Sequence, residues 1–216
     1  MPPPMYDIND WTETMKGGPL EILLKGHLWL EVIMNDFLTY ATNDSKALDI
    51  DRQSFSAKLN ICEAFSLFSE SRANTYRVIN RKRNRLAHDI KHSFTEESYA
   101  EIFSSLDDRL KAGLASLLDG SDLEGQSEDE RLATKLQMLL LMVASDTGYA
   151  LARYKYEKEN SSQISSYHLV RTLIRELGSN FETDEETKVR IGLEDPPNPE
   201  IVWGTTTGDW LDHGEP

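Results

Sequence analysis

The stretch LEILLKGHLWLEVIMNDFLTYA, residues 20–41, decides the fold class of this chain. Its apolar residues recur at intervals of three and four, as on one face of an α-helix, whereas a half-buried strand would alternate strictly. This stretch therefore predicts a mostly buried helix. The apolar positions on its main stripe, followed by those that widen it, are Leu20, Leu24, Met34 and Leu38, then Leu23, Trp29, Leu30, Ile33 and Phe37.

Two polar residues, His27 and Glu31, lie on the same stripe, four residues apart. Side chains four apart on a helix are neighbours on its surface, so we expect these two to face each other inside the protein. Buried polar groups are nearly always hydrogen-bonded. We interpret the pair first as a satisfied core hydrogen bond, and second as a support for a functional site.

Further helices are predicted on the C-terminal side of this stretch, each from an apolar period and a start or stop signal. The predicted helices are Ser54 to Phe68, about Arg72 to His88, Thr95 to about Leu118, Ser127 onward for two or three dozen residues, and 166–177 before Gly178. Ser and Thr at the starts are good N-caps, and a glycine at the end is a common C-cap. No strand series is found. The sequence thus predicts an all-α, up-and-down helical bundle of about five to six helices.

One helical domain with a tail on either side is the predicted organisation. The 216 residues suffice for one domain with a full core and are short for two. Residues 1–18, rich in Pro, Gly and polar groups, are predicted as an N-terminal tail. Residues 19–178 are predicted to form the domain, with a core in 20–118 and additional helices in 127–178. Residues 179–216 are predicted as an extended acidic tail containing prolines, Trp203 and Trp210.

Composition narrows the class of protein. The single cysteine, Cys62, cannot form an internal disulfide, and the N-terminus lacks the basic-then-apolar layout of a secretory signal, so we expect a cytoplasmic protein. No uncharged apolar run approaches the roughly 18 residues of a spanning helix, and we expect no membrane association. The net charge of −14 opposes a general nucleic-acid coat, because such affinity comes largely from Lys and Arg on phosphates.

The charge is unevenly distributed, however. Between Arg72 and His92 seven basic residues stand against one acid, Asp89, which gives this window +6 on an otherwise acidic chain. Most charge runs of this kind form a solvated helix face. A local basic patch that binds a polyanion is the more specific alternative interpretation. The basic residues are Arg72, Arg77, Arg81, Lys82, Arg83, Arg85 and Lys91.

Helical spacing divides the residues of this window between two faces. Arg77, Arg81, Asn84 (or Arg85) and His88 recur on one face, whereas Tyr76, Ile79, Arg83, Leu86 and Ile90 form an apolar stripe beside it. Arg83 is therefore predicted on or near the core side. A guanidinium there needs a carboxylate, because an unpaired buried charge costs several kcal/mol. Glu31 and Glu63 are the candidate partners. From spacing alone, an Arg83 that only ties helices together is at least as good an interpretation as catalysis.

The segment Arg83-Asn84-Arg85-Leu86-Ala87-His88 resembles the R-x4-6-H motif of HEPN domains, including the Asn that the family prefers directly after the Arg. Its surroundings also resemble the subgroup that contains the mannitol operon repressor family. The similar segments are Phe55 to Leu59, Ala64-Phe65, Ile79 to Asp89 and Ser93-Phe94-Thr95. The similarity covers roughly residues 20–110. Beyond them no family is assigned.

The resemblance implies a metal-independent endoribonuclease that cleaves single-stranded RNA and needs no cofactor. His88 would act as general base and acid, Arg83 would stabilise charge on the phosphorane, and Asn84 would orient the phosphate or the imidazole. The residues expected to bind the RNA backbone are Arg77, Arg81, Lys82, Arg85 and Lys91. The residues expected to support the site are His27, Glu31 and Asp89.

The resemblance also implies partners and a cellular role. In active HEPN enzymes two protomers place their motifs together across a two-fold axis, so a homodimer formed partly by the third predicted helix is expected. A toxin or phage-defence role, with an antitoxin or regulatory protein as partner, is an expectation by analogy. Some HEPN toxins carry a modifiable Tyr two positions after the His. Because Ile90 occupies that position here, that mode of regulation is not expected.

Two other interpretations stay open, and a third, a metal site, is set aside. The chain is alternatively a non-catalytic regulator like the mannitol operon repressors, acting through protein partners, because it is acidic and shows no DNA-reading helix. It is alternatively a helical interaction module in which Arg83 and His88 serve packing alone. His88 and His92 have the spacing of a zinc-protease helix, but Asp89 replaces the Glu and no third ligand is marked out. No metal site is therefore expected.

Overall fold

The computed structural model describes residues 11, 13–42, 48–88, 93–121, 123, 125–161 and 164–165. These residues form α-helices and one short 3-10 helix, with no strand among them, which confirms the predicted all-α class. The elements are α2 (Pro19–Ala41), η1 (Ile50–Arg52), α3 (Phe55–Ala64), α4 (Glu70–His88), α5 (Glu96–Ser105), α6 (Asp108–Asp119) and α7 (Glu128–Glu159). Among the described residues, no helix combines the length and apolar character needed to cross a membrane.

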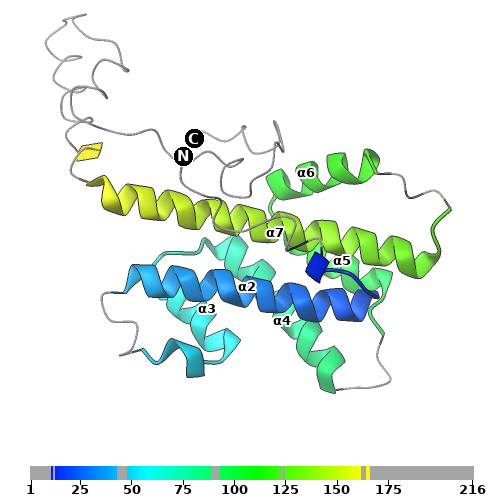
Figure 1. Ribbon diagram of the computed structural model, residues 1–216, viewed down its shortest axis with the longest axis horizontal. Coiled ribbons are helices and arrows are strands. Elements are labelled where there is room, and N and C mark those ends of the chain that lie inside the picture. Colours follow the sequence, from blue (N-terminus) through cyan, green and yellow to red (C-terminus); the bar gives the residue numbers. More distant parts are fainter. Residues whose placement is uncertain are drawn as a thin grey trace, which may run out of the picture.

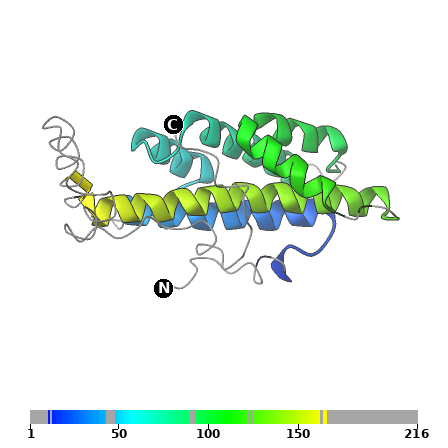
Figure 2. The ribbon, with the colours of Figure 1, turned by 90° about the horizontal axis from the view of Figure 1, so that it is seen from above.

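The helices are arranged in two layers. The two longest, α2 and α7, lie side by side, and α3 to α6 pack behind them (Figure 1). Figure 2, turned by 90°, shows α3 to α6 together on one side of the α2–α7 pair. Helix α4 therefore has one side against the long pair, and this position fixes which of its residues reach solvent.

Helices α2 and α7 run in the same direction. Near their C-terminal ends Tyr40 Oη donates a hydrogen bond to Glu159 at 2.6 Å, and Lys158 Nζ donates to the Tyr40 carbonyl at 2.9 Å. Gly26 lies where the two helices approach closely, since a Cβ there would come 2.5 Å from a methyl group of Leu140. A glycine at this position lets the helices approach, which offsets its low helix propensity.

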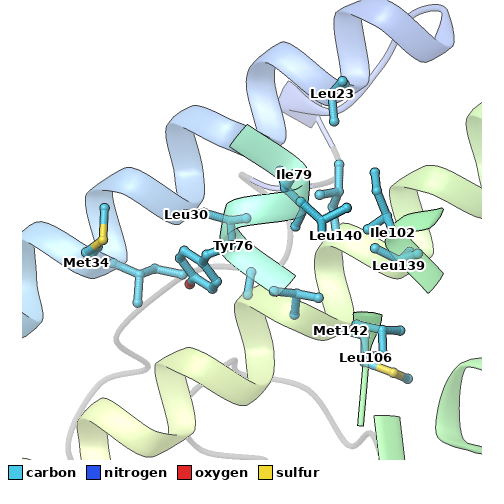
Figure 3. Packing of buried hydrophobic residues seen from close by; sticks show 14 of the residues in the cluster. Leu23, Leu30, Met34, Tyr76, Ile79, Ile102, Leu106, Leu139, Leu140 and Met142 are labelled. Atoms are coloured by element: carbon cyan, nitrogen blue, oxygen red, sulfur yellow. The ribbon is translucent and has the colours of Figure 1, made fainter. Parts of the chain in front are cut away.

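The core is built from α2, α4 and α7, closed by α5. Figure 3 shows Leu30 and Met34 of α2, Tyr76 and Ile79 of α4, and Leu140 of α7 gathered around the point where these helices meet. All five side chains are fully buried. The contacts bury apolar surface from segments far apart in sequence, and this burial is the dominant favourable term in folding.

The buried face of α2 is rotated relative to the predicted stripe. Leu23, Leu30, Ile33, Met34 and Phe37 are buried as predicted, but Leu20 is 40% exposed and Leu24 is half-buried. Packing explains the difference, because α7 and α4 cover the side of α2 that carries Leu30 and Met34. Of the four residues predicted on the main stripe, Met34 and Leu38 are buried as predicted, whereas the placement of Leu20 and Leu24 with them was wrong.

Two predicted helix boundaries were also wrong. The helix predicted to run from Thr95 to Leu118 is broken into α5 and α6, because Leu106 adopts an extended conformation and the Asp107 carboxylate accepts a hydrogen bond from the Leu110 amide at 2.8 Å. This aspartate is an N-cap that starts a new helix. Helix α3 ends at Ala64 and not at Phe68, since Ser66 has a positive φ of 56°.

Helix α7 agrees with its prediction. It has 32 residues and begins with a capping box, in which the Ser127 side chain accepts from the Glu130 amide and the Glu130 carboxylate accepts from the Ser127 amide. The helix predicted over 166–177 and the tail that carries Trp203 and Trp210 lie outside the described residues. In the predicted N-terminal tail, Trp11 and Met15 are buried, so this part of the segment packs on the domain.

Candidate functional site

Helix α4 carries the residues singled out from the sequence, and its packing decides which of them reach solvent. Tyr76, Ile79 and Leu86 are buried, which matches the predicted apolar stripe. At the start of the helix the Ser69 hydroxyl accepts a hydrogen bond from the Arg72 amide at 3.3 Å. The helix is thus held by its buried stripe, while its C-terminal turn presents polar side chains. Ile90, the last predicted member of the stripe, lies outside the described residues.

Arg83 and Asn84 are both half-buried and contact each other. Arg83 Nη1 donates a hydrogen bond to Asn84 Oδ1 at 3.0 Å. The carboxylates expected to pair with Arg83 have other partners, since Glu31 accepts from Lys58 and Glu63 forms an ion pair with Arg77. The predicted Arg83 ion pairs were therefore wrong. The guanidinium is oriented by an amide at the edge of the core, which leaves its charge uncompensated in the described part of the chain.

His88 is the last residue of α4, and its side chain is exposed. Within the described residues its imidazole makes no hydrogen bond. Asn84 lies one helical turn before it, and Arg85 between them is also exposed. Arg83, Asn84, Arg85 and His88 thus form a short polar segment at the C-terminal end of α4, which we name the α4 terminal cluster.

Most other basic residues of the window are neutralised. Lys82 is only 6% exposed and contacts Glu101 at 2.5 Å, and Arg81 lies 3.7 Å from the same carboxylate. The hydrogen bond from Lys82 is the main cause that lowers the pKa of Glu101. Arg77 is paired with Glu63. Of the residues predicted to bind RNA, Lys82 is covered, Arg77 and Arg81 are paired, and Lys91 lies outside the described residues. Arg85 is exposed, and its charge contributes to lowering the pKa of Glu101.

His27 and Glu31 do not form the expected pair. His27 is buried, and its Nε2 lies 3.0 Å from Asn80 Oδ1, while the Asn80 amide donates to the Ser56 hydroxyl at 3.2 Å. His27 therefore donates through Nε2, which leaves Nδ1 unprotonated, and this buried nitrogen has no hydrogen-bond partner among the described residues. The ring stacks on Phe55 with centroids 4.2 Å apart. The prediction of a core hydrogen bond between His27 and Glu31 was wrong, because packing brings Asn80 of α4 to His27 and Lys58 of α3 to Glu31.

The stability of the fold should depend on the protonation of His27. Burial is the main cause that lowers its pKa below the ordinary value of 6.5, with a smaller contribution from the nearby Arg83 charge. The unfolded chain takes up a proton near pH 6.5 while the folded chain does not, so the free energy of unfolding falls as the pH drops below about 6.5. The slope from one such group is at most about 1.4 kcal/mol per pH unit.

This dependence can be measured by urea unfolding between pH 5 and 7.5. We expect His27→Gln, which cannot titrate, to show a flatter profile than the wild type over this range. A matched control is His88→Gln, which removes an exposed imidazole and should keep the wild-type slope. Equal slopes for the wild type and His27→Gln would contradict the assignment of a buried neutral imidazole.

A buried charge cluster that the sequence did not single out lies at the other end of α4. Asp146, in the middle of α7 and 6% exposed, accepts hydrogen bonds from Arg72 at 2.8 and 3.2 Å and also binds Arg109 of α6. A small polar hollow beside it is lined by Ser69, Ser71, Thr75 and Asp107 among others. The sequence signal that could have indicated this cluster is the single carboxylate, Asp146, within a Leu- and Met-rich helical stretch, because a buried Asp needs charged partners.

Among the described residues no three His, Cys, Asp or Glu side chains gather closely enough to hold a metal ion. Asp89 and His92, which belong to the zinc-protease spacing, lie outside that part of the chain. No protein-family model, curated protein or solved structure matches this chain. The α4 terminal cluster and the resemblance of its motif are therefore the features that bear on function.

Proposed function

We propose that this chain is a HEPN-type, metal-independent endoribonuclease that cleaves single-stranded RNA as a homodimer. The observation that carries the proposal is the α4 terminal cluster. Its exposed imidazole, His88, follows one helical turn after Asn84, which accepts a hydrogen bond from Arg83. One helix end thus carries an exposed imidazole, an amide that accepts from Arg83, and a guanidinium with no ion pair among the described residues.

The residues supply the parts that RNA strand cleavage needs. An imidazole can take the proton of the 2′-hydroxyl as this oxygen attacks the adjacent phosphorus, and can return a proton to the leaving 5′-oxygen. The attack forms the new O–P bond and breaks the bond to the 5′-oxygen, so the products carry a 2′,3′-cyclic phosphate and a 5′-hydroxyl. Arg83 stabilises the negative charge that develops on the phosphorane. Asn84 keeps the guanidinium in place through its amide oxygen.

Charge distribution favours a small RNA footprint. The chain carries a net charge of −14, and Arg72, Arg77, Arg81 and Lys82 of α4 contact carboxylates. Arg83 and Arg85 are the α4 cations for which the described residues show no ion pair. Few phosphate contacts mean weak binding that falls modestly with salt. A single-stranded segment suits such a site, because its sugar and phosphate can reach a helix end that no groove surrounds.

Activity and stability together test the role of Arg83. With EDTA present, we expect the wild type to cleave a single-stranded RNA and Arg83→Gln to lose most of this activity with little change in melting temperature. Arg153→Gln, which removes an α7 arginine that bonds to Glu157, is the control and should stay active. If Arg83→Gln lowers the melting temperature strongly and RNA is untouched by every form, Arg83 is a structural tie and the proposal fails.

A second candidate is a non-catalytic regulator that acts through a protein partner. It is favoured by the neutralisation of Arg77, Arg81 and Lys82 within α4, which leaves little charge for a nucleic acid. Under this alternative, the chain neither binds nor cleaves RNA, and substitution of His88 leaves the RNA equally intact. The same EDTA assay therefore separates the two candidates.

A further inference from the structure

Three cations of α4 surround one carboxylate of the neighbouring helix α5. Lys82 Nζ lies 2.5 Å from the Glu101 carboxylate, and the Arg81 guanidinium lies 3.7 Å from it. Arg85 follows Arg81 by one turn on the same face of α4 and is exposed. The hydrogen bond from Lys82, and with it the charges of the two arginines, lowers the pKa of Glu101, so this carboxylate is ionised at neutral pH. The group thus holds three positive charges against one negative charge.

The exposure of these side chains differs sharply. The Lys82 side chain is only 8% exposed, whereas that of Glu101 is 45% exposed and that of Arg81 is 64% exposed. A buried ammonium needs an anionic partner, and among the described residues Glu101 is the carboxylate that contacts Lys82. An anion from solvent therefore reaches Lys82 most directly at the place that Glu101 occupies. The two arginines are open to the same anion from the solvent side.

A phosphodiester suits these cations as a carboxylate does. Both groups carry one negative charge on two oxygens, arginine binds each of them with two parallel hydrogen bonds, and lysine is a common phosphate ligand. The remaining acid on this face of α5, Glu97, lies one turn before Glu101, is exposed, and forms no ion pair with these cations among the described residues. The site therefore keeps a positive charge when Glu101 leaves it.

The position of the group relates it to the α4 terminal cluster. Arg81 precedes His88 by seven residues, which is roughly 10 Å along the helix axis. A strand that is cleaved beside His88 therefore has a further phosphate group within reach of Arg81. Arg85 lies between the two positions and belongs to both groups.

We propose that Glu101 occupies the binding site of an RNA phosphate, and that a phosphodiester of the substrate displaces it from the three cations. The inference deepens the proposed function, and its choice of RNA as the ligand rests on that function. Glu101 acts as an internal competitor. It keeps Lys82 paired while the site is empty, and it weakens RNA binding because its own contact must first be broken.

Binding of a single-stranded 2′-O-methyl oligonucleotide to the full chain tests the displacement. The methyl group blocks the attacking hydroxyl, so this probe reports binding without cleavage. We expect Glu101→Gln to bind it several-fold more tightly than the wild type does, because a neutral amide competes less for the cations. Glu96→Gln is the matched control, since Glu96 is 46% exposed and pairs with Lys135 of α7. It should bind as the wild type does.

Melting temperature gives a readout that a purely structural ion pair would not move. Without the oligonucleotide, Glu101→Gln should melt a few degrees below the wild type, because buried Lys82 loses its partner. A saturating concentration of the oligonucleotide should restore most of this loss, because a ligand that binds the folded state stabilises it. Inorganic phosphate at the same phosphate concentration should restore much less, because it lacks the strand that also contacts the α4 terminal cluster.

Arg81→Gln gives a second test that does not depend on the folding of Glu101→Gln. Arg81 is exposed, so this variant should keep the wild-type melting temperature and bind the oligonucleotide several-fold more weakly. The matched control is Arg52→Gln, which removes an 85% exposed arginine that contacts Asp49 at 3.4 Å. It should leave the affinity unchanged, and equal affinity of both variants and the wild type would overturn the proposal.

Other outcomes would also overturn the proposal. If Glu101→Gln binds the oligonucleotide no more tightly than the wild type, Glu101 does not compete with a phosphate. A lowered melting temperature that the oligonucleotide does not raise would make Glu101 only a structural partner of Lys82. Equal restoration by inorganic phosphate would exclude RNA as the ligand. RNA cleavage by the wild type with none of these effects would overturn the site and leave the α4 chemistry standing, whereas all of these effects without cleavage would do the reverse.

Discussion

Replacement of Asp146 by asparagine is expected to lower the free energy of unfolding by about 3 kcal/mol. Removing one partner of a buried ion pair typically costs about 3–5 kcal/mol, because a charge is left without compensation. Here two guanidiniums lose their carboxylate, and the lower end applies because Arg109 is 36% exposed and can be solvated. The expected change can be measured by urea unfolding monitored by circular dichroism.

A surface ion pair provides the control. Glu157→Gln removes the carboxylate that pairs with Arg153 on the exposed side of α7, and exposed pairs contribute at most about 1 kcal/mol. Asp146→Asn should therefore be clearly less stable than Glu157→Gln. The double variant Asp146→Leu/Arg72→Met should recover part of the lost free energy of unfolding, because it removes both the carboxylate and one of the guanidiniums that pair with it. A loss below 1 kcal/mol in Asp146→Asn would mean that the cluster is not a structural tie.

His88→Ala is expected to reduce RNA cleavage by about 10²–10⁴-fold, the contribution typical of a general acid or base. The side chain is exposed at the end of α4, so the substitution should leave the melting temperature unchanged. The rate is best measured under single-turnover conditions in EDTA, which separates the chemical step from RNA binding. A loss of rate at unchanged RNA affinity would assign the residue to proton transfer.

The matched control is Asn74→Ala, an exposed polar position near the other end of the same helix. It makes a similar change in helix propensity about four turns away and should retain the wild-type rate. If both variants keep the wild-type rate, the imidazole is not the catalytic group. If both variants lose the same large part of the rate, the substitutions act through a general effect on α4.

The sequence predicted most of the fold, since periodicity and caps are local signals. The helices that begin at Pro19, Phe55 and Glu128 were predicted from apolar spacing and from Pro or Ser at their starts. The helix that begins at Glu70 was predicted from about Arg72, two residues late. The break between α5 and α6 was missed, because Asp107 is also compatible with a helix interior and acts as a cap only in the extended context of Leu106. Local patterns thus predicted the presence of the helices correctly and the positions of their ends less well.

Partners were predicted less well, because they depend on how helices pack. His27 lies four residues from Glu31 on α2, yet it bonds to Asn80 of α4, and Glu31 bonds to Lys58 of α3. A buried polar group takes the partner that tertiary packing brings to it, and this is not encoded in spacing along one helix. The same reason explains why Lys82, which looked like a phosphate ligand, is covered and paired with Glu101.

The most direct test of the central claim is an analysis of the ends that the purified wild-type chain leaves on a single-stranded RNA in EDTA. Attack by the 2′-hydroxyl, assisted by His88, predicts 5′-hydroxyl ends paired with 2′,3′-cyclic phosphates, and their absence with His88→Ala. Intact RNA, ends with 3′-hydroxyls, or the same products from His88→Ala would contradict the proposed ribonuclease.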